Sequence, residues 1–156
     1  MANTPTSTLV IVTGPAGAGR TTAIHVFEDL GFETIDNLPI SFFESLLAGD
    51  GGAGRPLAIW IDSRTRGFSA RALADLIATL RRRGGLETHL LLLDCADDVL
   101  LRRYSETRRK HPLARDDAPE DGIAAEKSLM EPLRELADDV IDTTDLSPHD
   151  LKDALR

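Results

Sequence analysis

Residues 9–22 read LVIVTGPAGAGRTT, and this stretch decides how the chain can fold. A short apolar run, typical of a buried strand, meets a glycine-rich turn, and the residues after the turn have the pattern of a helix. The stretch matches the pattern G-x-x-x-x-G-K-[ST] with one change, because Arg20 stands where the pattern has lysine. That pattern is typical of a backbone cradle for phosphate groups.

The chemistry of this turn explains its residue types. Glycines let the backbone approach an anion and turn its N–H groups inward, and the helix N-terminus adds the positive end of its dipole. We expect Arg20 to neutralise phosphate and Thr21 to complete the coordination shell of Mg²⁺. Arginine is bulkier than lysine, so we expect it to preserve phosphate affinity better than the positioning of a γ-phosphate. The candidate phosphate-binding residues are Gly14, Pro15, Ala16, Gly17, Ala18, Gly19, Arg20, Thr21 and Thr22.

An ordinary glycine-rich connection between a strand and a helix is the alternative interpretation of this turn. It is disfavoured because the glycine spacing, the cation, the hydroxyl and both flanking elements occur together.

Length and composition limit the kind of protein. The 156 residues, 42% of them hydrophobic, suffice for one domain with a core. With 18 basic and 26 acidic residues the formal charge is −8, which disfavours non-specific nucleic-acid binding through the overall field. Cys95 is the only cysteine, which excludes an internal disulfide and a cysteine-cluster metal site, and we expect it to be buried. No signal peptide or membrane-spanning stretch is evident, so we expect a cytoplasmic protein without membrane contact.

Strand and helix patterns alternate along the whole chain, which predicts an α/β fold with a mostly parallel sheet. Ser69 is expected to cap one of the helices, and Gly31 to end the first. We expect strands at residues 9–12, 32–36, 57–62, 89–94 and 139–142, and helices at residues 21–30, 42–47, 70–83, from 97 onward, 123–136 and 147–155.

Three carboxylates lie where a predicted strand ends. Asp62 can hold a water or Mg²⁺ opposite the phosphate cradle, although an aspartate at a strand end also commonly caps the next turn. Asp94 is a weaker candidate for the same role. Asp36 can face a phosphoryl acceptor, because ligands bind outside the carboxyl ends of parallel strands. A simple turn formed by Asp36 and Asn37 is at least as plausible an interpretation.

A basic stretch precedes the polar segment around residues 111–122. Such runs are usually solvated helix faces. Here the stretch can also belong to a lid that clamps phosphate, because arginines stabilise charge on a transferring phosphoryl group. Its members are Arg102, Arg103, Arg108, Arg109 and Lys110, with Arg115 following.

Taken in order, these pieces resemble the N-terminal domain of the RapZ/YvcJ family of P-loop nucleotide-binding proteins, known as RNase adapters. The segments DNLP and LRRYSETRR with HPL are more specific for the family than the glycine-rich turn alone. The resemblance is carried by residues 14–22 (GPAGAGRTT), 28–32 (EDLGF), 36–39 (DNLP), 62–64 (DSR), 101–109 (LRRYSETRR), 111–113 (HPL), 131–134 (EPLR) and 137–143 (ADDVIDT).

The resemblance implies a three-layer α/β/α P-loop NTPase fold of the nucleoside-kinase type, with a parallel five-stranded sheet. It also implies binding of ATP or GTP with Mg²⁺ and slow hydrolysis, so the activity expected is that of a weak ATPase or GTPase. On this interpretation Arg20 and Asp62 are the catalytic candidates, and Thr21 and Asp62 hold the metal. A second nucleotide-contacting motif maps onto Asp62, Ser63, Arg64 and Thr65.

The resemblance also bears on domains and partners. We expect residues 1–156 to form one nucleotide-binding domain, without the C-terminal domain that in the family is associated with regulatory RNA and amino-sugar phosphate sensing. The adapter function is therefore not expected of this piece in isolation, and an RNA or protein partner and an oligomer belong to the full-length context. Two alternatives stay open: a small-molecule or nucleotide kinase with Asp36 as acceptor base, and a non-catalytic nucleotide-sensing module.

Overall fold

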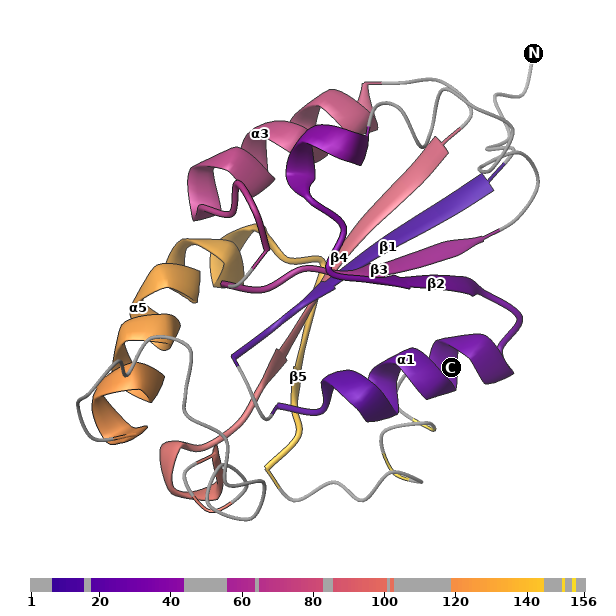
Figure 1. The fold of residues 1–156 in the computed structure, drawn as a ribbon. Helices are drawn as coiled ribbons and strands as arrows, with labels where there is room; N and C mark the ends of the chain where they lie inside the picture. The colour runs from indigo at the N-terminus through magenta and orange to yellow at the C-terminus, as the bar shows by residue number, and fades with distance from the viewer. Residues whose placement is uncertain are drawn as a thin grey trace.

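The fold is a parallel sheet of five strands in the order β2-β3-β1-β4-β5 (Figure 1). The structure is a computed structural model, and it describes residues 7–15, 18–43, 56–63, 65–82, 86–100, 102, 119–144, 150 and 153. The strands are β1 (Ser7–Thr13), β2 (Glu33–Asp36), β3 (Leu57–Trp60), β4 (Leu86–Asp94) and β5 (Asp139–Asp142). The helices are α1 (Arg20–Asp29), the short 3₁₀ helix η1 (Ile40–Phe42), α3 (Ala70–Arg81) and α5 (Pro119–Leu136).

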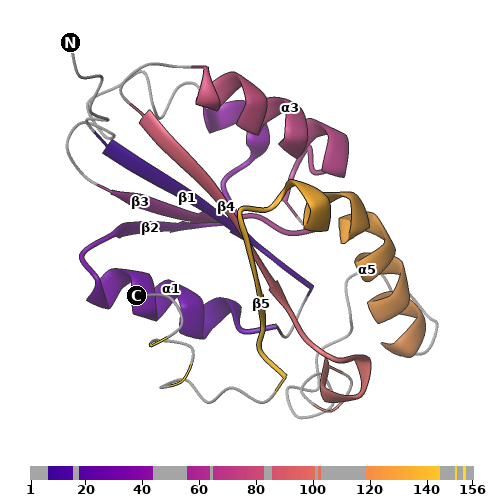
Figure 2. The ribbon, with the colours of Figure 1, turned by 180° about the vertical axis from the view of Figure 1, so that it is seen from behind.

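Helices cover both faces of the sheet. Helix α1 lies on one face, and α3 and α5 lie on the other, as both views show (Figures 1 and 2). Central strand β1 pairs with β3 on one side and with β4 on the other, and all four strand pairings are parallel. The strand order therefore reverses at β1, and ligands of open parallel sheets bind at such a point, beyond the carboxyl ends of the strands. The predicted three-layer α/β/α arrangement with a parallel five-stranded sheet is confirmed.

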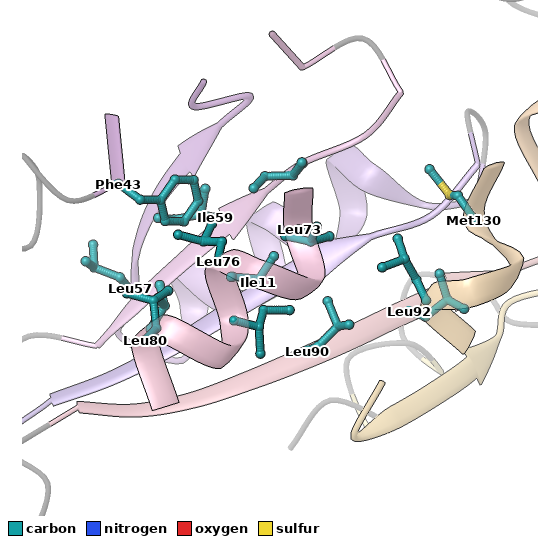
Figure 3. Close-up of a cluster of buried hydrophobic side chains, with 14 residues drawn as sticks. Ile11, Phe43, Leu57, Ile59, Leu73, Leu76, Leu80, Leu90, Leu92 and Met130 are labelled. Atoms are coloured by element: carbon teal, nitrogen blue, oxygen red, sulfur yellow. The ribbon is translucent and has the colours of Figure 1, made fainter. Parts of the chain in front are cut away.

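The core is divided by the sheet, because successive side chains of a strand point to opposite faces. On the face of α3 and α5, Ile11, Ile59 and Leu90 pack against Leu73 and other apolar residues of α3 (Figure 3). On the face of α1, a second cluster contains Val12, Trp60 and Leu93 of the strands with Ala23 and Phe27 of the helix. Because side chains alternate along each strand, the two clusters show which face of the sheet the side chain at each strand end lies on.

The predicted elements agree with the structure in type and differ mainly at their ends. β3 ends at Trp60, two residues before Asp62, and β4 begins at Leu86, earlier than predicted. α5 begins at Pro119, ahead of the predicted residue 123. Residues 97–100 are helical as predicted, whereas the helix expected at 42–47 is described only as η1 and one further residue. Most of the helix expected at 147–155 lies outside the described residues.

Local predictions about caps and burial are also borne out in part. Ser69 caps α3 by accepting a hydrogen bond from the backbone N–H of Ala72 at 2.9 Å. Cys95 is buried as expected. On α1 the buried side chains are Ala23, Val26 and Phe27, and Leu30 at its end is half-buried. Within the part of the chain that the structure describes, no helix combines the length and the apolar character needed to span a membrane.

One close contact fixes where β1 gives way to the glycine-rich turn. A Cβ atom at Gly14 would lie 2.3 Å from the backbone oxygen of Leu93 in β4. No real side chain fits there, so the turn can run against β4 only with glycine at this position.

Gly14→Ala is therefore expected to destabilise the domain through overpacking against a backbone group that cannot move aside. The cost is at the upper end of such changes, about 3 kcal/mol, which corresponds to a fall in Tm of about 6–12 °C for a domain of this size. Thermal unfolding followed by circular dichroism measures it. An unchanged Tm would contradict the close packing of the turn on β4.

Candidate functional site

The second half of the turn leads into α1 without a side-chain cap at the start of the helix. Gly19 is the N-cap residue, with φ 117° and ψ 26°, and it provides no side-chain cap. A positive φ of this kind is adopted at little cost by glycine alone. The backbone N–H of Ala23 donates to the Gly19 oxygen at 2.9 Å, so earlier N–H groups have no acceptor within the helix. A helix start of this kind favours a bound anion.

Arg20, the first residue of α1, forms an ion pair with Asp36 at the end of β2. Nη1 of Arg20 donates to Oδ2 of Asp36 at 2.8 Å, and both side chains are partly exposed, at 30% and 43%. The pair brings together the cation of the turn and a carboxylate that the sequence offers as an acceptor-facing group.

Asp62 lies on the same face of the sheet as α1. It is 2% exposed, and its Oδ2 accepts a hydrogen bond at 2.8 Å from Nε1 of Trp60, whose side chain belongs to the cluster beneath α1. Thr21 is exposed in the first turn of that helix. Mg²⁺ in phosphate sites is held by one or two carboxylates, with phosphate and water oxygens completing the shell. The carboxylate and hydroxyl fit that donor chemistry. Among the described residues, no group of three or more His, Cys, Asp and Glu side chains is arranged to hold a metal ion.

The connections after β2 and β3 are tied together beside Asp62. The Thr65 hydroxyl accepts from the backbone N–H of Asp62 at 3.0 Å and donates to Oδ1 of Asn37 at 2.5 Å. Asn37 has φ 71°, a conformation that non-glycine residues seldom adopt. Its backbone N–H donates to the Trp60 oxygen at 2.8 Å. These contacts tie the connection after Asp36, at the end of β2, to Asp62, which lies two residues beyond β3.

Asp94, the weaker candidate for the metal role, points to the opposite face of the sheet. Its carboxylate forms ion pairs with Arg134 and, at 3.7 Å, with Lys127, and both of these cations are on α5. Lys127 also contacts Asp97 at 2.6 Å. Asp94 therefore joins β4 to α5 and does not share a face with Asp62. A small pocket of about 20 Å³ beside this junction is lined by Pro15, Leu92, Asp94, Lys127, Met130, Glu131 and Arg134.

A hydrogen-bonded turn follows β5 at the same edge of the sheet. Oδ1 of Asp142 accepts from the Thr144 hydroxyl at 2.5 Å and from the Thr144 backbone N–H at 2.9 Å. These bonds favour the ionised carboxylate, so they lower the pKa of Asp142. The Thr144 hydroxyl in turn accepts from the backbone N–H of Ala96 at 2.8 Å. The loops after β4 and β5 are thus linked.

The structure brings most of the predicted site residues to one edge of the sheet. Other predicted residues lie outside the described part of the chain: Ala16, Gly17, Arg64, Arg103, Arg108, Arg109, Lys110 and Arg115. Arg102 is described and is exposed. The predicted residues that the structure describes at this edge are Gly14, Pro15, Ala18, Gly19, Arg20, Thr21, Thr22, Asp62, Ser63 and Thr65.

Sequence reasoning gave no role to two residues that form contacts at this edge, Lys127 and Thr143. The hydroxyl of Thr143 donates to the backbone oxygen of Ala18, a contact between residues 125 positions apart. The signal for Thr143 was its place immediately after a predicted parallel strand, because the carboxyl ends of all such strands meet at one edge.

The RapZ-like N-terminal domain model matches residues 7–156. The chain belongs to this family. A nucleotide-binding protein of Dinoroseobacter shibae is 57% identical over 144 residues, which cover 92% of this chain and 48% of the relative. A nucleotide-binding protein of a Ruegeria species is 54% identical, with the same coverage of both chains. This RapZ-like chain thus spans about half the length of the curated relatives that it matches.

Solved structures share the fold of this RapZ-like domain at low sequence identity. A shikimate kinase from Acinetobacter baumannii in complex with shikimate superposes with a TM-score of 0.61 and 23% identity, covering 94% of this chain and 89% of that chain. A shikimate kinase from Bacteroides thetaiotaomicron gives 0.60 and 17%, covering 95% and 98%. The domain therefore has the fold of the P-loop kinases, as the sequence predicted.

Thr144→Val should raise the pKa of Asp142 towards that of an ordinary aspartate, because the hydroxyl that hydrogen-bonds to the carboxylate is removed. A carboxyl pKa that is lower in the folded than in the unfolded protein stabilises the fold above the unfolded value of about 3.9. This contribution is lost as the pH falls through the lowered pKa of the folded state. Carboxyl NMR titration measures the pKa directly, and identical titration curves for Asp142 in both proteins would contradict the assignment.

Proposed function

We propose that this domain binds a nucleoside triphosphate, ATP or GTP, with Mg²⁺ at the glycine-rich turn between β1 and α1, and hydrolyses it slowly. The observation that carries the proposal is the start of α1. Gly19 has φ 117° and provides no side-chain cap, and the basic residue Arg20 follows it. Uncapped N–H groups, a helix dipole and a guanidinium converge at this point, which is the combination that a polyphosphate needs. Membership of a family whose relatives are named nucleotide-binding proteins supports the same conclusion.

Arg20 supplies the positive side-chain charge of the proposed site. Its guanidinium is paired with Asp36 at 2.8 Å, so a phosphate bound at the turn would compete with that carboxylate. The pair is partly exposed, and such ion pairs contribute only about 0.2–1 kcal/mol. A triphosphate offers several charged oxygens in bidentate reach of an arginine, and it therefore outcompetes one carboxylate.

Thr21 and Asp62 are the residues that would hold Mg²⁺. When bound, the metal would neutralise charge on the phosphate oxygens. Trp60 holds the Asp62 carboxylate through the hydrogen bond to Oδ2, and Thr65 holds its backbone, so the protein's own contacts orient this residue. Hydrolysis would break the bond between the β–γ bridging oxygen and the γ-phosphorus, with water as the attacking group.

Slow turnover follows from the same residues. Arg20 replaces the compact ammonium of the usual pattern with a larger planar group, and it is also drawn towards Asp36. On family membership we further assign the domain to an RNase-adapter type of regulator. There, nucleotide state would be communicated to an RNA or protein partner of a longer protein.

A small-molecule kinase is the second candidate, and the Arg20–Asp36 pair is the observation that favours it. The pair sets a carboxylate beside the cation of the phosphate turn, where a hydroxyl acceptor could lose its proton. Product analysis separates the two functions. Radiolabel transferred from γ-labelled ATP to a metabolite mixture supports a kinase, whereas free phosphate as the sole product supports hydrolysis. Tight binding without either product would leave a nucleotide-sensing module.

Arg20→Ala should weaken ATP or GTP binding by about 1–3 kcal/mol, because a charge-assisted contact to phosphate is lost. Asp36→Asn is the matched control at the other end of the ion pair. It should strengthen binding about two- to fivefold, since one competing anion worth a fraction of a kcal/mol is removed. Isothermal titration calorimetry with Mg²⁺ present measures both. Equal affinities in all three proteins would rule out Arg20 as a phosphate ligand.

Asp62→Asn should reduce Mg²⁺-dependent phosphate release by at least about tenfold while the domain stays folded, because the amide keeps the size of the side chain but not its charge. The Tm of the variant provides the control for folding. A phosphate-release assay with and without Mg²⁺ gives the result, and a variant that melts normally and turns over at the unsubstituted rate would remove Asp62 from the site.

A further inference from the structure

The side-chain hydroxyl of Thr143, the residue after β5, contacts the glycine-rich turn directly. Thr143 is 3% exposed and follows the last residue of β5. Its Oγ1 lies 2.7 Å from the backbone oxygen of Ala18 and 3.0 Å from that of Asp94. A hydroxyl has a single proton to donate, and the Asp94 oxygen already accepts the Thr143 backbone N–H at 2.8 Å. The shorter bond, to Ala18, is thus the one that the hydroxyl proton favours.

This bond determines how the next peptide group is oriented. Because the peptide unit is planar and trans, the oxygen of Ala18 and the N–H of Gly19 point in opposite directions. Holding the Ala18 oxygen towards Thr143 therefore turns the Gly19 N–H to the other side of the turn. Gly19 has φ 117°, which permits this orientation directly before α1.

Both backbone polar groups of Ala18 have hydrogen-bond partners within the protein. The residue is 0% exposed, and its backbone N–H donates to the Pro15 oxygen at 3.1 Å. With its oxygen held by Thr143, both polar groups of this residue are satisfied within the protein. If the whole Ala18–Gly19 peptide plane flipped, its carbonyl oxygen would replace the Gly19 N–H on the open side of the turn. That oxygen would repel an anion.

We propose that Thr143 is a positioning residue of the phosphate site, which fixes the peptide group between Ala18 and Gly19 so that an N–H faces the phosphate. The inference rests on the proposed function, because it assigns the open side of the turn to a triphosphate. It also gives the loops after β4 and β5 a role in the site, since Thr143 bonds to Asp94 as well as to Ala18.

The test compares three substitutions in the full chain by calorimetric titration with ATP and with inorganic tripolyphosphate, in the presence of Mg²⁺ and well below each Tm. Thr143→Val keeps the side-chain shape and removes the hydroxyl, and Thr143→Ser keeps the hydroxyl. Thr88→Val is the matched control, because the Thr88 hydroxyl is also buried in the sheet and has no hydrogen-bond partner among the described residues.

Thr143→Val is expected to weaken both ligands by about tenfold, on the order of one lost hydrogen bond and one misdirected peptide group. Thr143→Ser should retain most of the affinity, and Thr88→Val should bind as the unsubstituted protein does. Amide NMR should show the Gly19 N–H resonance displaced in Thr143→Val alone. Should that variant fail to fold, Thr143→Ala removes the same hydroxyl and is measured in its place.

Two outcomes overturn the inference in distinguishable ways. If the unsubstituted chain binds both ligands and Thr143→Val binds them equally well, the positioning role is wrong and the proposed function stands. If the unsubstituted chain takes up neither ligand, the proposed function itself fails and the inference fails with it. A lower Tm for Thr143→Val with unchanged affinity counts as the first outcome, because a merely structural role predicts that result.

Discussion

The site depends on one steric constraint, the contact between Gly14 and the backbone of β4. A Cβ atom would approach the Leu93 oxygen to 2.3 Å, so the chain leaves β1 pressed against its neighbouring strand. This places the turn beside the carboxyl ends of β4 and β5, where Ala18 accepts a hydrogen bond from Thr143. The sheet therefore fixes the start of α1, whose first N–H groups receive no side-chain cap.

The two faces of the sheet divide the charged groups into separate sets. On the face of α1, Arg20 pairs with Asp36, and Asp62 is oriented by Trp60. On the opposite face, Asp94 is paired with cations of α5. This separation follows from the alternation of side chains along the strands. Asp62 lies two residues after Trp60 and takes its face, that of α1, whereas Asp94 lies two residues after Leu92 and takes the face of α3 and α5. One set is available to a ligand, and the other joins β4 to its covering helix.

The fold and the turn could be predicted from the sequence because their signals are local. Strand and helix periodicity, the spacing of Gly14 and Gly19, and the cap at Ser69 all lie within short windows. The partner of Arg20 could not be predicted with certainty, because β2 and α1 meet only in the folded chain. Thr143 was missed as a functional residue for the same reason, since its acceptor is 125 positions away. The sequence does not exclude Asp94 from the metal site, because the packing of β4 against α5 decides which face of the sheet its side chain takes.

We propose that the backbone at the start of α1 binds a polyphosphate. A titration of the isotopically labelled chain with ATP and Mg²⁺, followed through its amide resonances, tests this most directly. The account predicts large, saturable shifts at Gly19, Arg20 and Thr21, with smaller ones around Thr143. An absence of shifts at millimolar ATP, or shifts confined to the Asp94 junction on the opposite face, would contradict it.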